Sequence, residues 1–199
     1  MEIDFKIIIN QFTIAVTIIS WIIFFFGFLI LKRRTAPSEM KRNRKAVVGF
    51  ILQAIGYAFV FGVRRKFFSD IISMSIPVAV IITIINLCLA SFSLWITLAA
   101  VKTLGKQWDM RARIIEGHQL IVFGPYKIVR HPIYSGMLGL LIITGYSLSQ
   151  WWALLVAIIF YFFGTVFRTK VEEGLLIEHF GEKYLEYKKA VPAIIPFIY

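Results

Sequence analysis

A cluster of residues able to bind ligands interrupts this otherwise apolar chain at residues 124–136, which read GPYKIVRHPIYSG. Pro132 suits the first position of a helix, because its missing amide hydrogen would be unpaired there in any case. His131 would then lie at or beside the helix N-cap, where unpaired amides attract a carboxylate or a phosphate. Tyr134 falls in the first turn, and Tyr126 follows a Gly-Pro turn and can offer an aromatic face. These types and spacings predict an anion-binding pocket with aromatic walls.

A second candidate is the pair Arg168 and Glu172 in the segment RTKVEE, because residues four apart share one helix face. The arginine could hold a carboxylate through two parallel hydrogen bonds, and the glutamate could balance a cation. Residues 117–120 (GHQL) could supply main-chain hydrogen bonds to a base, whereas His179 is interpreted as a surface histidine. The alternatives are an ordinary ion pair worth about 0.2–0.5 kcal/mol and, for the first cluster, interfacial anchors within an aromatic belt.

The elements that must position these residues are apolar. Hydrophobic residues make up 59% of the 199-residue chain and charged residues 17%, against roughly 25% in an ordinary soluble domain. A hydrocarbon core about 30 Å thick needs about 20 helical residues. We therefore expect an all-α, polytopic membrane protein with about five transmembrane helices, at residues 12–31, 46–63, 76–101, 132–148 and 151–167.

Two stretches are too polar for a membrane core, residues 102–130 and 168–199. The second begins as an amphipathic helix that continues the fifth apolar run, until Gly181 interrupts it and a proline-containing tail follows. Only two residues separate the fourth and fifth runs, which predicts a helical hairpin. We expect three N-terminal transmembrane helices in residues 1–101 and a catalytic region in residues 102–199.

Lysine and arginine residues are distributed unevenly between the two sides that five spans would create. Eighteen of the 22 fall on one side, at residues 32–45, 102–130 and 168–199, and four fall on the other, at Lys6 and residues 64–66. Because the positive-inside rule places the excess in the cytoplasm, we expect an outside N-terminus, a cytoplasmic C-terminus and both polar stretches on the cytoplasmic face. The cluster at 64–66 is interpreted as an interfacial clamp, and the net charge of +11 needs no nucleic acid partner.

Several kinds of site are excluded by the residues available. The single cysteine, Cys88, allows neither an internal disulfide nor a cysteine metal cluster. The three histidines lack the spacing of metal ligands, so no metal site is expected. No glycine-rich phosphate loop and no serine nucleophile elbow occurs. The acidic start MEIDFK and the long first apolar run also argue against a signal peptide.

The order of these motifs closely resembles the isoprenylcysteine carboxyl methyltransferase family. The resemblance runs from Gly117 to the end of the chain, through GHQLIVFGPYKIVRHPIYSG, the hairpin and RTKVEEGLLIEHFGEKYLEYKKAVPAIIPF. It implies an integral membrane enzyme that transfers a methyl group from S-adenosylmethionine to the C-terminal carboxylate of a prenylated cysteine. The lipid-like acceptor would enter from the membrane. The first three helices carry no matching motif.

The resemblance also assigns roles to residues of this chain. It implies an acceptor-binding arginine at Arg168, with Arg168 and Glu172 as the catalytic residues. Ile121 replaces a more usual valine, and VPAIIPF stands where a glycine-leucine pair is common. The implied cofactor-binding residues are His118, Gln119, Leu120, Ile121, Tyr126, His131, Pro132, Ile133, Tyr134 and Glu172.

The chemistry of such a transfer makes modest demands. The acceptor carboxylate is already ionised at neutral pH, so the protein mainly has to position two partners and exclude water. Two other enzyme classes stay open: an NADPH-dependent membrane sterol or steroid reductase, which shares the RHP-x-Y-x-G segment, and a phospholipid N-methyltransferase, which differs in its acceptor. A transporter or scaffold is disfavoured, because the expected spans are nearly free of charge.

Overall fold

The computed structural model describes residues 2–31, 38–65 and 75–196, and the basic residues at 32–34 and 66 lie outside these ranges. Most of the described residues are helical. The elements, in order, are α1 (Glu2–Leu31), β1 (Glu39–Arg42), α2 (Ala46–Gly62), α3 (Ile76–Leu104), η1 (Gly105–Gln107), β2 (Arg113–Ile115), η2 (Gly124–Lys127), α4 (Pro132–Leu148), α5 (Trp151–Phe180) and α6 (Glu182–Ala190).

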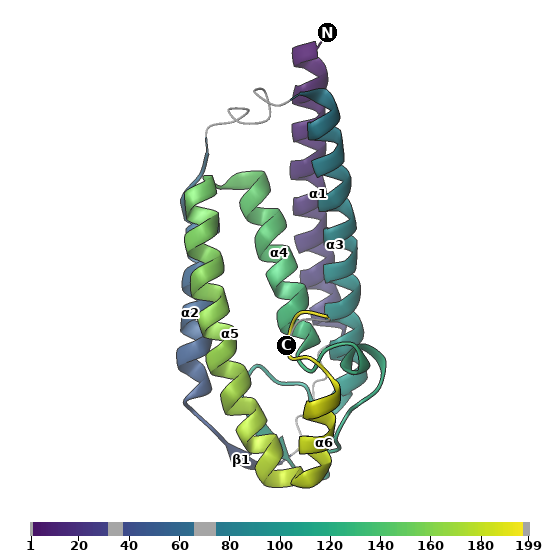
Figure 1. Cartoon of the computed structure of the whole chain (residues 1–199), viewed down its shortest axis with the longest axis vertical. Helices are drawn as coiled ribbons and strands as arrows, with labels where there is room; N and C mark the ends of the chain where they lie inside the picture. The colour runs from purple at the N-terminus through teal and green to yellow at the C-terminus, as the bar shows by residue number, and fades with distance from the viewer. Residues whose placement is uncertain (1, 32–37, 66–74, 197–199) are drawn as a thin grey trace.

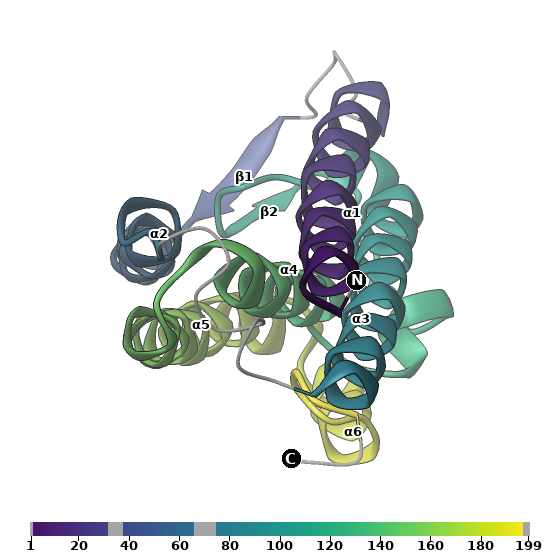
Figure 2. The ribbon, with the colours of Figure 1, turned by 90° about the horizontal axis from the view of Figure 1, so that it is seen from above.

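The helices α1 to α5 run alternately down and up and form an elongated bundle (Figure 1). Helix α3 packs along α1, α2 packs along α5, and α4 lies between these two pairs, as the view from above shows (Figure 2). Strand β1 and helix α6 lie at the lower end in Figure 1, where α3 and α5 end and α4 begins. The alternation therefore brings the two polar stretches of the sequence to the same end of the bundle.

The five predicted apolar runs are all helical, with differences at their ends. Helix α5 continues without a break past the fifth run to Phe180, as predicted, and Gly181 ends it with a φ of +57° that favours glycine. The first run begins earlier than predicted, because α1 starts at Glu2 and not at residue 12. The apolar pattern locates residues compatible with hydrocarbon, whereas the helix itself extends through the polar residues before them.

The expectation of an all-α fold is wrong in one detail, because β1 pairs with β2 in a small antiparallel sheet. Glu39 lies opposite Ile115, and Arg42 lies opposite Arg113. Strands this short carry too few residues for a recognisable alternation of apolar and polar positions. The sheet ties the segment before α2 to the segment that leads from α3 toward α4.

Helices α2 and α5 approach each other closely because glycines face the contact. A Cβ atom added at Gly56 would lie 2.7 Å from the carbonyl oxygen of Ala157, and one added at Gly164 would lie 2.9 Å from the amide nitrogen of Gln53. The Gln53 side chain also donates a hydrogen bond of 2.8 Å to Oγ1 of Thr165. Small residues and interhelical hydrogen bonds of this kind are typical of helices that pack within a membrane.

The outer surface of the bundle is apolar. Phe25, Ile30 and Phe163 are 59%, 81% and 61% exposed, which is expected where lipid rather than water covers the surface. The helices long and apolar enough to cross a membrane are Asp4–Leu31, Ile76–Gln107 and Trp151–Phe180. Helices α2 and α4 are also apolar but have 17 residues each. The chain is therefore a helical membrane protein, and its total of five spans stays a prediction.

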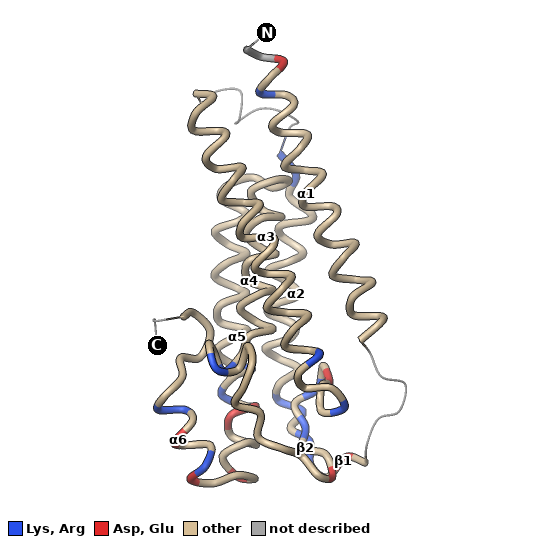
Figure 3. Tube along the Cα trace, turned by 90° about the vertical axis from the view of Figure 1, so that its right-hand side faces the viewer, with Lys and Arg blue, Asp and Glu red and all other residues tan. Residues whose placement is uncertain are grey.

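Charged residues gather at the end of the bundle that carries β1, β2 and α6 (Figure 3). The middle of the bundle is largely free of them in the same view. This separation agrees with the uneven distribution of lysine and arginine in the sequence. The side of the membrane that this end faces, and the division of the chain at residues 101 and 102, stay predictions.

The orientation can be tested with reporters fused to the two ends of the chain. We expect a C-terminal green fluorescent protein to fluoresce and a C-terminal alkaline phosphatase to be inactive, because the charged end should face the cytoplasm. The same reporters at the N-terminus serve as the control and should give the opposite result. A C-terminal phosphatase that is active would reverse the proposed orientation.

Candidate active site

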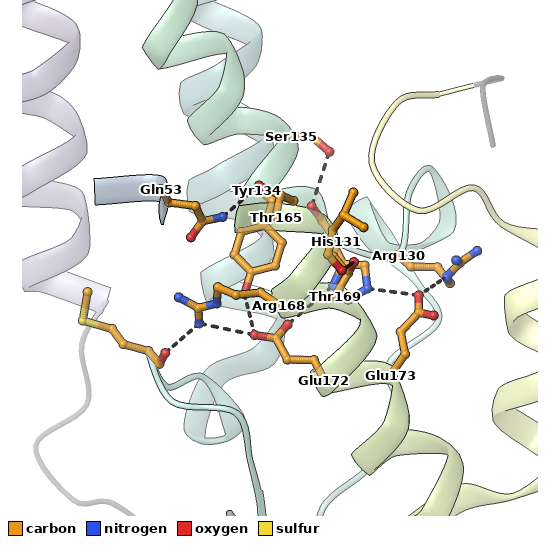
Figure 4. Close-up of polar contacts among 12 residues, drawn as sticks. Gln53, Arg130, His131, Tyr134, Ser135, Thr165, Arg168, Thr169, Glu172 and Glu173 are labelled. Carbon is orange, nitrogen blue, oxygen red and sulfur yellow. Dashed lines mark hydrogen bonds and ion pairs between the residues drawn. The ribbon is translucent and has the colours of Figure 1, made fainter. Parts of the chain in front are cut away.

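Arg168 and Glu172 lie one turn apart on α5, at the charged end of the bundle, and contact each other (Figure 4). The Nη2 atom of Arg168 lies 3.3 Å from Oε1 of Glu172 and donates a second hydrogen bond, of 2.7 Å, to the main-chain carbonyl of Met110. Arg168 is only 5% exposed. The arginine of this ion pair is therefore buried and the glutamate is partly buried, and a buried charge requires such a partner.

Glu172 connects α5 to the start of α4. The hydroxyl of Tyr134 donates a hydrogen bond of 2.5 Å to Oε1 of Glu172. The Nδ1 atom of His131 lies 3.6 Å from its Oε2 atom. Two motifs that are far apart in the sequence, RHPIY and RTKVEE, thus meet at one carboxylate.

The neighbouring carboxylate, Glu173, contacts three basic side chains, one of which, His131, also faces Glu172. It lies 2.9 Å from Nε of Arg130, 2.7 Å from Nζ of Lys188 and 3.2 Å from Nε2 of His131. Glu173 is 6% exposed. Sequence patterns assign Glu173 no role, because nothing in the residues around it reveals that three distant cations contact it.

The segment after α6 lies across the start of α4. The main-chain amides of Arg130 and His131 donate to the carbonyls of Pro192 and Ala193 at 2.8 and 2.9 Å. The side chain of Arg130 also donates to the carbonyl of Lys188 at 3.0 Å. The tail of the chain therefore occupies the two amides that precede α4, and the expected anion site at this helix start stays a prediction.

The imidazole of His131 lies between the two glutamates and stacks on Tyr134, with 5.7 Å between ring centroids. Burial by itself would lower the pKa of His131, but the hydrogen bonds and negative charges of Glu172 and Glu173 outweigh it and raise that pKa. His131 therefore keeps its proton to a higher pH than a free histidine, whose pKa is about 6.5. A protonated imidazole can donate to both carboxylates at once.

The guanidinium of Arg168 lies over two aromatic rings. Its Cζ atom is 5.3 Å from the ring centroid of Tyr134 and 5.7 Å from that of Phe50, which comes from α2. Its Nε atom is buried and has no hydrogen-bond partner among the residues that the structure describes. An unsatisfied buried donor costs about 1–3 kcal/mol, so this group is suited to an additional acceptor such as a carboxylate.

These groups share one cavity of about 910 Å³, which lies within the range of about 300–1,000 Å³ typical of small-molecule sites. The structure brings every site residue named from the sequence to its wall. The roles of these residues stay predictions. They are His118, Gln119, Leu120, Ile121, Tyr126, His131, Pro132, Ile133, Tyr134, Arg168 and Glu172.

His118 contributes a neutral ring to the cavity wall. Burial, together with the nearby positive charges of His179 and Arg113, lowers its pKa to about 4. Its Nδ1 atom is buried without a hydrogen-bond partner among the described residues. His118 can therefore exchange a hydrogen bond with a ligand near neutral pH. His179 is exposed, as the sequence predicted.

The cavity also has walls that the sequence did not predict. Phe25 and Leu29 line it and are also 59% and 52% exposed on the outer surface of α1, so this wall borders the lipid. Ordinary apolar residues in a membrane helix carry no signal that would distinguish a cavity wall from a lipid-facing surface. The unpredicted lining residues include Phe24, Phe25, Phe28, Leu29, Phe50, Gln53, Tyr184 and Tyr187.

Within residues 2–31, 38–65 and 75–196, no group of three or more histidine, cysteine, aspartate or glutamate side chains is placed to hold a metal ion. Two charged groups of the cavity, Arg168 and Glu172, are paired with each other.

The fold and the site together define a helical membrane protein with a charged, ligand-sized cavity at one end. A family described as the isoprenylcysteine carboxyl methyltransferase family matches residues 78–178, which is just over half of the chain. The chain belongs to this family, which confirms the resemblance seen in the sequence. The match covers α3 to most of α5, so α1 and α2 lie outside it.

Curated relatives agree with this family. The chain is 32% identical to protein-S-isoprenylcysteine O-methyltransferase of Xenopus laevis and 33% identical to that of Homo sapiens, each over 130 residues and 59% of this chain. It is 33% identical to protein-S-isoprenylcysteine O-methyltransferase B of Arabidopsis thaliana over 103 residues, or 50% of this chain. The matches cover 41%, 42% and 51% of these relatives, so the chain spans about half of their length or less.

Proposed function

We propose that this protein transfers a methyl group from S-adenosylmethionine to the C-terminal carboxylate of a prenylated cysteine or a related lipid-like acceptor. One observation carries the proposal: a carboxylate-binding group, Arg168, and a cation-binding group, Glu172, lie 3.3 Å apart in a cavity with both polar and apolar walls. Family membership supports it. The comparisons give no support to a reductase or a phospholipid N-methyltransferase.

The polar part of the cavity suits S-adenosylmethionine in charge and hydrogen bonding. The carboxylate of Glu172 matches a cationic group, and the neutral ring of His118 has an unsatisfied Nδ1 for a base. Residues 118–121 line the same cavity. When bound, this cofactor supplies a methyl group made electrophilic by a positively charged sulfur. Glu172, His118 and Tyr126 would hold it.

Arg168 would bind the acceptor carboxylate. Its Nη2 atom now donates to the carbonyl of Met110, and its Nε atom is unsatisfied. A carboxylate could take the place of that carbonyl and satisfy both nitrogens at once, because a guanidinium presents parallel N–H groups that match the two oxygens. The exchange would remove a buried unsatisfied donor, so it favours a bound carboxylate.

No proton has to be removed from the acceptor, because a C-terminal carboxyl group with a pKa of about 3.3–3.7 is ionised at neutral pH. The residues of the site therefore need to hold the acceptor and the cofactor and to orient them toward each other. Arg168 fixes the carboxylate, Glu172 and Tyr134 fix the neighbouring wall, and the aromatic side chains exclude water. Orientation and a dry site are the effects that accelerate a transfer of this kind.

The apolar wall would receive the lipid part of the acceptor. Phe25 and Leu29 border both the cavity and the outer surface of α1, so the lipid chain of the acceptor could enter from the membrane beside them. The soluble cofactor would arrive at the charged end, which we place at the cytoplasmic face. On this proposal, residues 102–199 carry the catalytic groups, and the helices before them supply the lipid-facing wall.

A transfer assay with matched acceptors tests the proposal. Purified protein should methylate N-acetyl-S-farnesyl-cysteine with S-adenosylmethionine. It should not methylate the corresponding amide, which keeps the lipid and the thioether but lacks the carboxylate that Arg168 would bind. Methylation of a phosphatidylethanolamine headgroup in place of the cysteine acceptor would contradict the proposed acceptor.

Titration calorimetry tests the cofactor separately. We expect S-adenosylhomocysteine to bind, and NADPH, added as the control, to show no binding under the same conditions. Binding of NADPH without binding of S-adenosylhomocysteine would favour the reductase class instead.

A further inference from the structure

Helix α2 contacts Arg168 directly, although it lies outside the residues that match the family model. The contacts come from Gly49 and Phe50, two adjacent residues in the first turns of α2. Gly49 lies beside the aliphatic part of the arginine side chain, and the ring of Phe50 lies beneath its guanidinium. The sequence assigned α2 to the membrane and gave it no part in the site.

Gly49 leaves room for the stem of Arg168. A Cβ atom added at Gly49 would lie 2.5 Å from Cγ of Arg168 and 2.5 Å from the carbonyl oxygen of Gly164. Both distances are shorter than any ordinary carbon contact, so a larger residue would displace the arginine, the helix, or both. The absence of a side chain at position 49 thus sets where the arginine stem lies.

Phe50 holds the charged head of the same arginine. Its ring centroid lies 5.7 Å from Cζ of Arg168, and Phe50 also lines the cavity. The hydrogen bonds of the guanidinium to Met110 and Glu172 both come from Nη2. The rings of Phe50 and Tyr134 hold the remainder of the guanidinium, because an aromatic face attracts this cation.

We propose that Gly49 and Phe50 are positioning residues that fix Arg168 for the acceptor carboxylate. The proposal rests on the proposed function. A long, flexible side chain must be held in one rotamer to present its fork to a carboxylate. Gly49 fixes the stem, Phe50 fixes the plane of the head, and Gln53 fixes the register of α2 on α5 through its hydrogen bond to Thr165.

The glycine test compares Gly49→Ala with Gly56→Ala. Gly56 is a matched control, because it lies on the same helix and also faces α5. A Cβ atom added there would lie 2.7 Å from the main-chain oxygen of Ala157 and would not contact Arg168. We expect both variants to lower the melting temperature similarly. Only Gly49→Ala should lower kcat/KM for the acceptor, by about 10- to 100-fold, with the dissociation constant of S-adenosylhomocysteine little changed.

The phenylalanine test keeps the proposal falsifiable if Gly49→Ala does not fold. Phe50→Leu removes the ring and should raise the acceptor KM by about 10-fold, since cation–π contacts at desolvated sites are substantial. Phe50→Tyr restores an aromatic face and should recover most of the loss. Phe59→Leu is the control, because Phe59 stacks on Phe160 at the same helix pair, with 5.8 Å between centroids.

The possible outcomes separate this inference from the function on which it rests. Wild-type protein that transfers no methyl group to the farnesylated cysteine overturns both proposals. Wild-type protein that is active, with equal kcat/KM in Gly49→Ala and Gly56→Ala, or with Phe50→Leu as active as Phe50→Tyr, overturns only the role of α2. An acceptor defect confined to Gly49→Ala and Phe50→Leu supports it.

Discussion

Replacing Arg168 by alanine is expected to lower kcat/KM for the acceptor by about 100-fold or more, which corresponds to about 2.7 kcal/mol of transition-state stabilisation. The guanidinium is buried, lies over two aromatic rings and keeps an unsatisfied Nε. A carboxylate bound there would be held in a partly dry site, where a charged contact is worth far more than in water. Affinity for S-adenosylhomocysteine should change little.

Two further variants distinguish binding of the acceptor from binding of the cofactor. Arg168→Lys keeps the charge but should not restore activity, because an ammonium cannot reproduce a two-pronged contact with a carboxylate. Glu172→Gln should weaken the binding of S-adenosylhomocysteine, because it removes the charge that would balance the cofactor. Lys170→Ala is the control, since Lys170 lies on the same helix but is exposed, and its activity should be near that of the wild type.

If Arg168 and Glu172 form only a structural ion pair, the same variants should give different results. An ion pair with no role in turnover would change stability but leave kcat/KM nearly intact in all of these variants. Near-normal activity of Arg168→Ala would therefore contradict the assignment, even if the protein melted at a lower temperature. Measuring turnover, cofactor affinity and melting temperature for the same preparations distinguishes the two.

Sequence patterns located the helices well because membrane helices obey strong and local rules. An apolar run must be long enough to cross hydrocarbon, and every backbone group within it must be bonded internally. Helix α4 accordingly begins at Pro132 and ends at Leu148, as predicted. The start of α1 was missed because the polar residues before the first apolar run are helical too, and hydropathy alone cannot show this.

The site was predictable where its residues carry distinctive chemistry. Arg168, Glu172 and Tyr134 belong to motifs with unusual polar residues at the edges of apolar runs, and the structure places them in contact. Gly49 and Phe50 are ordinary in a membrane helix. Their contact with Arg168 depends on the packing of α2 on α5. This packing is a property of the folded bundle, and the sequence of neither helix alone predicts it.

The contacts of the C-terminal tail were missed for a related reason. A helix start with unpaired amides predicts an anion only if nothing else satisfies those amides. Here the carbonyls of Pro192 and Ala193 accept hydrogen bonds from the amides of Arg130 and His131, immediately before α4. The proline-containing tail predicts irregular structure, but its return to the start of α4 follows from contacts between residues far apart in the sequence, such as Arg130 and Lys188.

Replacing Glu173 by alanine is expected to destabilise the protein by about 3–5 kcal/mol, because it removes one partner of a buried ion cluster and leaves the others uncompensated. Arg130, His131 and Lys188 all lie within 3.2 Å of this carboxylate. Glu178→Ala is the control, since that glutamate lies on the same helix but pairs with Lys41 at the surface. An exposed pair of this kind contributes less than about 1 kcal/mol.

The pH dependence of stability should also change when Glu173 is replaced by glutamine. Because the folded state raises the pKa of His131, the stabilisation that this histidine contributes is fully present below its unfolded pKa of about 6.5 and is lost as the pH rises through its higher folded pKa. Glu173→Gln should shrink this loss without abolishing it, because Glu172 still faces the ring. Thermal unfolding between about pH 6 and pH 9 gives the slope of stability against pH for the wild type and for Glu173→Gln. Equal slopes for the two proteins would contradict the role of Glu173.

The same cluster should determine how firmly the tail is held across α4. Glu173 binds Arg130 and Lys188, and Arg130 in turn donates to the carbonyl of Lys188. Without the carboxylate, these two cations repel each other, so the end of α6 should open more often. Trypsin should then cleave after Lys188 or Lys189 several times faster in Glu173→Ala than in the wild type or in Glu178→Ala. Unchanged cleavage would mean that the main-chain bonds to Pro192 and Ala193 hold the tail without help from the buried charges.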